Sequence, residues 1–147
     1  MKYFNFSIFL IIFCLISCSD KPIYFENSCS IDIINNNGHW IIDRNGEITV
    51  DLAGWVADGY SKATPESIII NIISTSGEII KLLEGKPTVE RPDVKTALNA
   101  PAMGNPGFGL ANTLKAPPLG IYKIQITKIY NNKIAICYSD KTVTISN

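Results

Sequence analysis

Hydrophobic and polar residues alternate along much of the chain, and this alternation predicts β-strands. In the segment 48–56, Ile48, Val50 and Leu52 alternate with polar or small residues. A period of two is that of a strand with one buried face. Apolar or alternating segments of strand length recur at 28–34, 39–43, 66–74, 78–83, 120–130, 133–138 and around Val143. Since no segment keeps the apolar period of a helix, we expect strands throughout.

Turn signals lie between these segments, and the clearest is Asn45-Gly46. Both residues tolerate the positive φ that a tight hairpin requires. Asn35-Asn36-Asn37-Gly38 and Asn131-Asn132 carry similar signals. Short strands joined by regular turns predict an all-β fold. We expect a single antiparallel β-sandwich, immunoglobulin-like in general architecture, in which two sheets pack their alternating faces together.

The segment 84–118 breaks this pattern because it holds six of the eight prolines. Proline removes a ladder hydrogen bond and fixes φ, so we expect a long loop here. Within the loop, the segment 93–98 predicts one short helical turn. Pro92 and Asp93 suit its start, where a fixed φ and a negative charge are both favourable.

The amino-terminal residues predict a secretory signal. Lys2 precedes an apolar run over 4–16 that is shorter than the roughly 20 residues of a membrane span. Ser17 and Cys18 follow, and Leu15-Ile16-Ser17-Cys18 resembles the lipobox of bacterial lipoproteins. The alternative is an ordinary secretory signal in which the cysteine is incidental.

The lipobox resemblance implies a lipid-modified Cys18 at the mature amino terminus. The expected organisation is a signal peptide over 1–17, a lipidated tether over 18–27 and the sandwich over 28–147. The expected location is the bacterial cell envelope. By the sorting habits of enteric bacteria, Ser19 indicates the outer membrane rather than the inner one.

The charge balance argues against electrostatic binding to nucleic acid or to anionic lipids. Without residues 1–17, the chain has 12 Lys and Arg against 13 Asp and Glu, with no basic run. Nucleic-acid binding and polybasic lipid binding both need a basic surface. We therefore expect no nucleic-acid partner, and a membrane partner only through the lipid on Cys18.

Cys29 and Cys137 are candidates for a disulfide, because the compartment beyond the inner membrane is oxidising. The strand phase argues against it. Cys29 shares a face with Ile31, which looks buried, whereas Cys137 alternates out of step with Ile134 and Ile136. Both alternatives stay open at this point.

Three local patterns occur in order over about 47–130, and together they resemble a known module. They are Gly54-Trp55-Val56-Ala57-Asp58, Arg91-Pro92-Asp93-Val94, and Gly107-Phe108 followed by Leu119-Gly120-Ile121-Tyr122. They are similar to the small β-sandwich module with Gly-Trp-Ala-Leu-Asp and Arg-Pro-Asp-Val-Ala signatures, often appended to glycosyltransferases. This chain departs from those signatures at Val56-Ala57 and at Lys95. The resemblance implies a non-catalytic sandwich.

The motif residues have plain structural roles as well. Asp58 suits the cap of the turn after its strand, and Arg91 with Asp93 can form a charge-assisted pair. Aromatic residues are preferred anchors for protein and carbohydrate ligands. The candidate ligand contacts are Trp40, Trp55, Tyr60 and Phe108, although Trp55 and Phe108 also suit packing against the core.

The sequence offers no catalytic set. His39 is the only histidine, and there is no CxxC pair, metal-ligand spacing or phosphate-binding glycine loop. We expect no cofactor, no metal and no enzyme. The predicted function is a binding module for an envelope protein or glycan. The alternative is a lipoprotein inhibitor or immunity factor that protects the cell from a periplasmic toxin.

Overall fold

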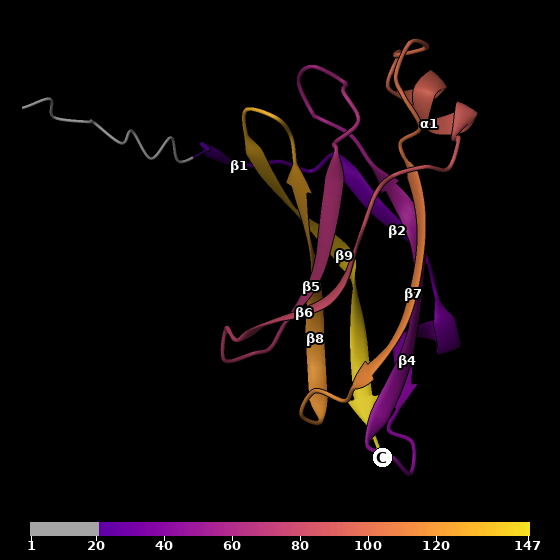
Figure 1. Cartoon of the computed structure of the whole chain (residues 1–147), viewed down its shortest axis with the longest axis vertical. Coiled ribbons are helices and arrows are strands. Elements are labelled where there is room, and N and C mark those ends of the chain that lie inside the picture. The colour runs from indigo at the N-terminus through magenta and orange to yellow at the C-terminus, as the bar shows by residue number, and fades with distance from the viewer. Residues whose placement is uncertain (1–20) are drawn as a thin grey trace, which may run out of the picture.

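The computed structural model describes residues 21–147. The predicted signal peptide and Cys18 lie outside this range. The described chain forms two β-sheets that pack as a sandwich, with one short helix at one end (Figure 1). The all-β sandwich is therefore confirmed.

The larger sheet has six strands in the order β1-β9-β8-β5-β6, and β3 pairs with the far end of β9. Their bounds are β1 Ile23–Phe25, β3 His39–Ile41, β5 Ser67–Ile73, β6 Ile79–Gly85, β8 Gly120–Ile129 and β9 Ile134–Ser146. The smaller sheet has the order β2-β4-β7, with β2 Cys29–Ile34, β4 Glu47–Val56 and β7 Gly107–Lys115. A 3₁₀ segment, Asn35–Gly38, follows β2, and the helix α1 spans Pro92–Ala97. Both β1 and β3 run parallel to β9, whereas the other strand pairs are antiparallel.

The core forms where the alternating faces of the two sheets meet. Inward residues of β4, such as Val50 and Leu52, pack in one cluster with Ile70 of β5 and Ile126 of β8. A fully buried aliphatic side chain contributes about 1.5–3 kcal/mol. The alternation in the sequence thus reports the buried face of β4 correctly, whereas the prediction of β5 rests on its short apolar run.

The prediction of a loop over 84–118 is wrong in its carboxyl-terminal part, because the strand β7 lies there. This strand pairs with β4 from Glu47↔Lys115 to Trp55↔Gly107. Most of its side chains face solvent, and only Phe108 is a large buried one. The hydrophobic alternation is therefore too weak to predict it. The expected helical turn is confirmed as α1.

The predicted tether is shorter than expected, because β1 belongs to the larger sheet. Ile23–Phe25 pair with Ile134–Ile136 of β9. The amide of Ile134 donates to the carbonyl of Pro22 at 2.9 Å, which continues the pairing by one residue. A strand at the edge of a sheet can pair through backbone hydrogen bonds alone, without burying a side chain. The pattern of hydrophobic residues therefore does not reveal β1. The sheet begins five positions after Cys18.

Cys29 and Cys137 form a disulfide with a Cα–Cα distance of 6.3 Å. The phase argument against it is wrong, because Cys137 faces inward and Ile134 and Ile136 face outward beside β1. The bond joins β2 of the smaller sheet to β9 of the larger one and spans 108 positions. A loop of this length corresponds to about 4–5 kcal/mol of stabilisation through the unfolded chain.

Candidate functional site

The first two sequence motifs meet Gly107-Phe108 of the third at one end of the smaller sheet, whereas Leu119-Gly120-Ile121-Tyr122 lies at the start of β8 in the larger sheet. Gly54 of β4 pairs with Phe108 of β7, and Trp55 pairs with Gly107. The side chain of Arg91 lies on Gly107, because its Cγ is 2.8 Å from where a Cβ of that glycine would be. Segments that are far apart in sequence therefore form one local structure.

Both glycines make room for these contacts. A Cβ on Gly54 would collide with the carbonyl oxygen of Ser30 and lie 3.0 Å from the Phe108 ring. A Cβ on Gly107 would lie 2.7 Å from the carbonyl oxygen of Val89. Contacts this short are not seen for real side chains, so glycine is required at both positions.

Arg91 fastens the loop before α1 to the smaller sheet. Its Nε and Nη2 donate to the two carboxylate oxygens of Asp93 at 2.9 and 2.7 Å, and its Nη1 donates to Asp32 of β2 at 2.5 Å. The predicted Arg91–Asp93 pair is confirmed, and Asp32 is a partner that the sequence does not reveal. Hydrogen bonds to Asp93 and Asp32 raise the pKa of Arg91, and Arg91 lowers the pKa of Asp93 to about 2. This fork has the geometry of a structural clamp.

The structure separates the four candidate aromatic contacts. Trp40 and Phe108 are buried in the core, so the prediction that they contact a ligand is wrong. The indole of Trp40 donates to Asn35 Oδ1 at 2.9 Å, which satisfies its one polar atom. Trp55 is half-buried on the outer face of the smaller sheet. Tyr60 is 95% exposed.

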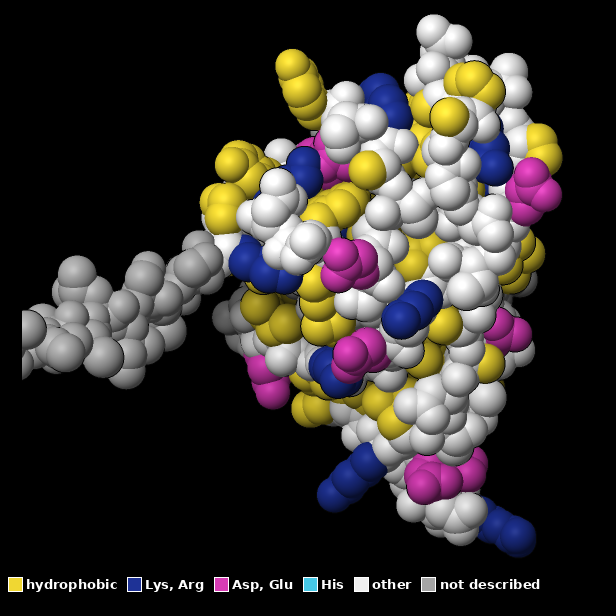
Figure 2. Space-filling model, turned by 45° about the horizontal axis from the view of Figure 1, so that its top comes forward, with side chains coloured by type: hydrophobic (Ala, Val, Ile, Leu, Met, Phe, Trp, Pro, Cys, Tyr) yellow, Lys and Arg dark blue, Asp and Glu magenta, His cyan; other side chains and the backbone are white. Residues whose placement is uncertain are grey.

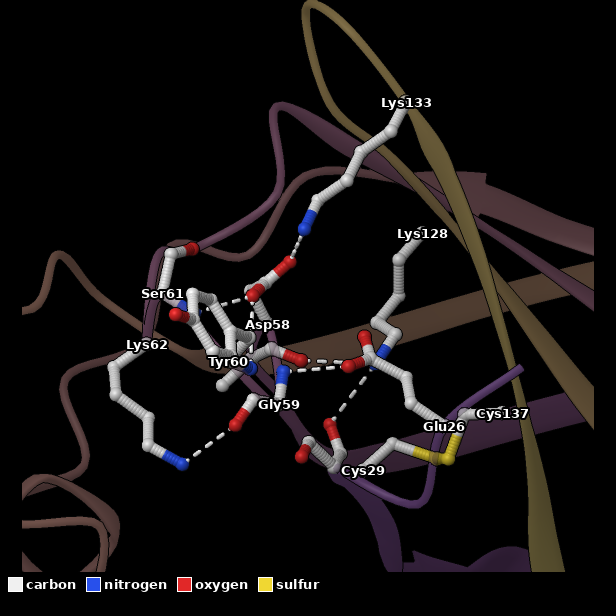
Figure 3. Close-up of polar contacts among 12 residues, drawn as sticks. Glu26, Cys29, Asp58, Gly59, Tyr60, Ser61, Lys62, Lys128, Lys133 and Cys137 are labelled. Atoms are coloured by element: carbon white, nitrogen blue, oxygen red, sulfur yellow. Dashed lines mark hydrogen bonds and ion pairs between the residues drawn. A yellow bond between two sulfur atoms is a disulfide. The ribbon is translucent and has the colours of Figure 1, made fainter. Parts of the chain in front are cut away.

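Tyr60 lies on a turn whose backbone is held by side chains (Figure 3). One carboxylate oxygen of Asp58 accepts from the amides of Tyr60 at 2.9 Å and Ser61 at 2.6 Å. The predicted capping role of Asp58 is therefore confirmed. The amide of Gly59 donates to Glu26 at 2.5 Å, and Lys62 Nζ donates to the carbonyl of Gly59 at 2.7 Å.

Two lysines, one on β8 and one in the turn between β8 and β9, pair with these two acids. Lys128 of β8 is fully buried, and its Nζ lies 2.5 Å from Glu26 and 2.8 Å from the carbonyl of Ala57. Lys133, which precedes β9, forms an ion pair with the second oxygen of Asp58. Figure 3 shows both lysines reaching toward the turn that carries Tyr60. We call Glu26, Asp58, Lys128 and Lys133 the charge cluster.

The charges in this cluster respond to burial and to each other. Burial alone would raise the pKa of Asp58, but the bond from Lys133 and the amides of Ser61 and Tyr60 lower it to about 2. Burial lowers the pKa of Lys128, and Glu26 opposes that shift. A buried charge is tolerated only when its partners replace water, and each charge here has such partners.

Aromatic rings enclose the outer lysine of the cluster. The Nζ of Lys133 lies 5.2 Å from the ring centre of Tyr130 and 5.9 Å from that of Tyr24. Both distances are in the range of cation–π attraction. Burial, and then the charges of Glu26 and Asp58, raise the pKa of the Tyr130 hydroxyl. The Tyr130 side chain therefore stays neutral beside the ion pair.

An open hollow of about 680 Å³ lies beside this turn, between the segments 61–64 and 99–104. Lys62 supplies charge to its lining, and Pro101 and Met103 supply apolar surface. The Thr64 hydroxyl oxygen is buried and has no hydrogen-bond partner within residues 21–147. The hollow thus offers mixed polar and apolar contacts next to an exposed aromatic ring.

The other candidate groups, a histidine and possible metal ligands, form no site near the turn that carries Tyr60 in the described chain. His39 is exposed on β3, which pairs with the far end of β9. Within residues 21–147, no group of three His, Cys, Asp or Glu side chains could hold a metal ion. The arrangement near Tyr60 favours recognition through an aromatic ring and hydrogen bonds.

Sequence reasoning missed Glu26, Lys128 and Lys133. One signal was available, because Lys128 is in phase with the inward residues Ile124 and Ile126 of the same strand. A lysine on the buried face of a strand requires a partner. The identity of that partner depends on tertiary contacts between distant segments, which the alternation does not report.

Comparison with known proteins assigns no family, because no family and no curated protein matches the chain. The chain is similar to part of an endo-β-1,4-mannanase from Thermotoga petrophila, with 17% identity and a TM-score of 0.42. That match covers 83% of this chain and 20% of the mannanase chain. A CARDB domain from Pyrococcus furiosus, solved in complex with di-metal ions, is similar with 12% identity and a TM-score of 0.36. That match covers 84% of this chain and 92% of the other.

Replacing Asp58 by Asn removes the charge that pairs with Lys133 but keeps an oxygen for the turn amides. We expect the free energy of unfolding at pH 7 to fall by about 2 kcal/mol, as for the loss of a charged hydrogen bond. Because the pKa of Asp58 is lowered from 3.8 to about 2, the unfolded chain binds its proton first as the pH falls. The wild-type protein should therefore lose this stabilisation between about pH 4 and pH 2, and Asp58→Asn should not.

Urea unfolding followed by tryptophan fluorescence across this pH range measures both effects. Asp51→Asn is the matched control, because Asp51 is an exposed aspartate on β4 and should be replaceable without effect. Equal stability of Asp58→Asn and wild type at pH 7, or parallel pH profiles, would contradict the role given to the ion pair.

Proposed function

We propose that this protein is a non-catalytic binding module of the bacterial cell envelope, held at a membrane by a lipid on Cys18. Its ligand is an envelope protein or glycan. Its binding surface is the turn of residues 58–62, which we call the Tyr60 turn, with the adjacent hollow. One observation carries the proposal. Tyr60 is almost completely exposed, yet the backbone of its turn is fixed, because its amides donate hydrogen bonds to the carboxylates of Asp58 and Glu26.

A rigid turn that presents an aromatic ring is suited to recognition. Ordering a flexible loop on binding costs free energy, and a turn that is already ordered avoids much of that cost. Tyrosine adds a large apolar face and a hydroxyl group that can donate or accept a hydrogen bond. Trp55 is the second candidate contact, because it is half-buried on the outer face of β4, five positions before Tyr60.

The lipid anchor is supported by the lipobox-like residues Leu15-Ile16-Ser17-Cys18 and by the charge balance. Within residues 21–147, no helix is long and apolar enough to cross a membrane. A lipid on Cys18 would supply attachment without such a helix, since each buried methylene contributes about 0.8 kcal/mol. The outer membrane is the proposed location.

Replacing Cys18 by Ala should release the protein from the membrane or block its processing. Fractionation of cells, together with the mass of the mature amino-terminal peptide, measures both outcomes. The control is Cys14→Ala, because Cys14 lies within the apolar run of the signal and should be replaceable. Membrane association that is unchanged in Cys18→Ala would refute the anchor.

Replacing Tyr60 by Ala should weaken ligand binding by tenfold or more, about the effect of losing one aromatic hot spot. Binding is measured on a glycan array and by capture of envelope proteins, with affinities then determined for the ligand found. Ile79→Ala is the matched control. Ile79 is also exposed, but it begins β6, at the end of the sandwich away from the Tyr60 turn. Equal affinities for Tyr60→Ala and wild type would remove the turn from the binding surface.

A further inference from the structure

The outer face of the larger sheet carries an apolar patch at the corner formed by β1. Ile23 pairs with Ile134 and Phe25 pairs with Ile136, and these side chains share the face that points away from the core. Tyr138 continues the same face of β9. We call these five residues the β1 patch. The Tyr60 turn follows β4 of the smaller sheet, so the β1 patch is a separate surface.

The patch is both exposed and ordered. Ile23 is 59% exposed and Phe25 is 70% exposed. The Phe25 ring stacks on that of Tyr138, with ring centres 6.5 Å apart and planes within 3°. The Tyr138 hydroxyl accepts a hydrogen bond from Gln125 Nε2 at 3.2 Å. Contiguous apolar surface of this kind marks a contact site in soluble domains.

The patch lies where the described chain begins. Figure 2 shows hydrophobic side chains gathered beside that point on the left of the molecule. Ile23 lies five positions after Cys18, and an extended chain over five positions spans at most about 18 Å. A lipid on Cys18 would therefore hold the β1 patch close to the headgroup layer.

The charges around the patch suit a phospholipid surface. Lys21 precedes β1, and its Nζ donates to the carbonyl of Tyr130 at 2.8 Å. Lys133, which directly precedes β9, is paired with Asp58 and so contributes no unpaired charge. The nearest acid along the chain, Glu26, is already paired with buried Lys128. Aromatic rings beside lysines favour the interface between lipid headgroups and acyl chains.

We propose that the β1 patch rests on the phospholipid surface and so sets the orientation of the domain on the membrane. This inference rests on the proposed lipid anchor at Cys18. The chain between Cys18 and β1 is short, so a lipid on Cys18 would keep the patch next to the membrane. The bilayer is therefore the apolar surface that the patch is expected to contact. A second copy of this chain, another protein or residues 4–16 would instead cover the patch without lipid contact.

The test places a tryptophan in the patch of the full chain, purified from membranes and reconstituted in phosphatidylcholine–phosphatidylglycerol vesicles with or without brominated acyl chains. Phe25→Trp is the main variant, and Tyr138→Trp is a second position in the same patch. Ile41→Trp is the matched control, because Ile41 is 64% exposed on β3, which pairs with the far end of β9. The parent, with Trp40 and Trp55, gives the background emission.

Insertion of the patch by about 5–10 Å should roughly halve the emission added by Phe25→Trp and by Tyr138→Trp in brominated vesicles. The emission added by Ile41→Trp should be unchanged. If the protein is not recovered with membranes, the anchor and this inference both fall. If it is anchored but the patch variants behave like Ile41→Trp, the inference falls and the anchor stands. Quenching of all three would also overturn it, because no single face would then be oriented to the lipid.

Discussion

A buried ammonium group organises the end of this sandwich that carries both proposed surfaces. Lys128 lies on the inner face of the larger sheet with no access to water. A charge in that position is stable only with close partners, and these are Glu26 and the carbonyl of Ala57. Glu26 in turn holds the amide of Gly59. One lysine thus connects the larger sheet, the segment between β1 and β2, and the Tyr60 turn.

The two proposed surfaces follow from this arrangement and face different neighbours. The turn carries Tyr60 toward solvent beside the hollow, whereas the β1 patch lies on the outer face of the larger sheet. Both lie near the start of the described chain, so an anchor at Cys18 would keep the binding turn close to the membrane. The disulfide from Cys29 to Cys137 joins the two sheets, and the bond from Arg91 to Asp32 holds the long loop to the smaller sheet.

A short apolar run predicts β5, and hydrophobic alternation predicts β4 and β8 well, because each of these two strands buries one regular face. Alternation fails where pairing is made by the backbone alone, as in β1, and where few apolar side chains turn inward, as in β7. Alternation gives the wrong phase for Cys137, because Ile134 and Ile136 are apolar yet face outward. The charge cluster could not be predicted as a unit, since Glu26, Asp58 and the Lys128–Lys133 hairpin are three distant segments of the chain. The lysine at position 128 was nevertheless an identifiable anomaly on an inward face.

Hydrogen exchange at the amides of Gly59, Tyr60 and Ser61, followed by NMR, tests most directly whether the charge cluster immobilises the turn. These amides lie on an exposed turn, so protection can come only from their bonds to Glu26 and Asp58. We expect them to exchange as slowly as amides of β4 in the wild-type protein, and Lys128→Met to lose protection at Gly59 first. Exchange of all three at the rate of an unstructured peptide in the wild-type protein would contradict the account.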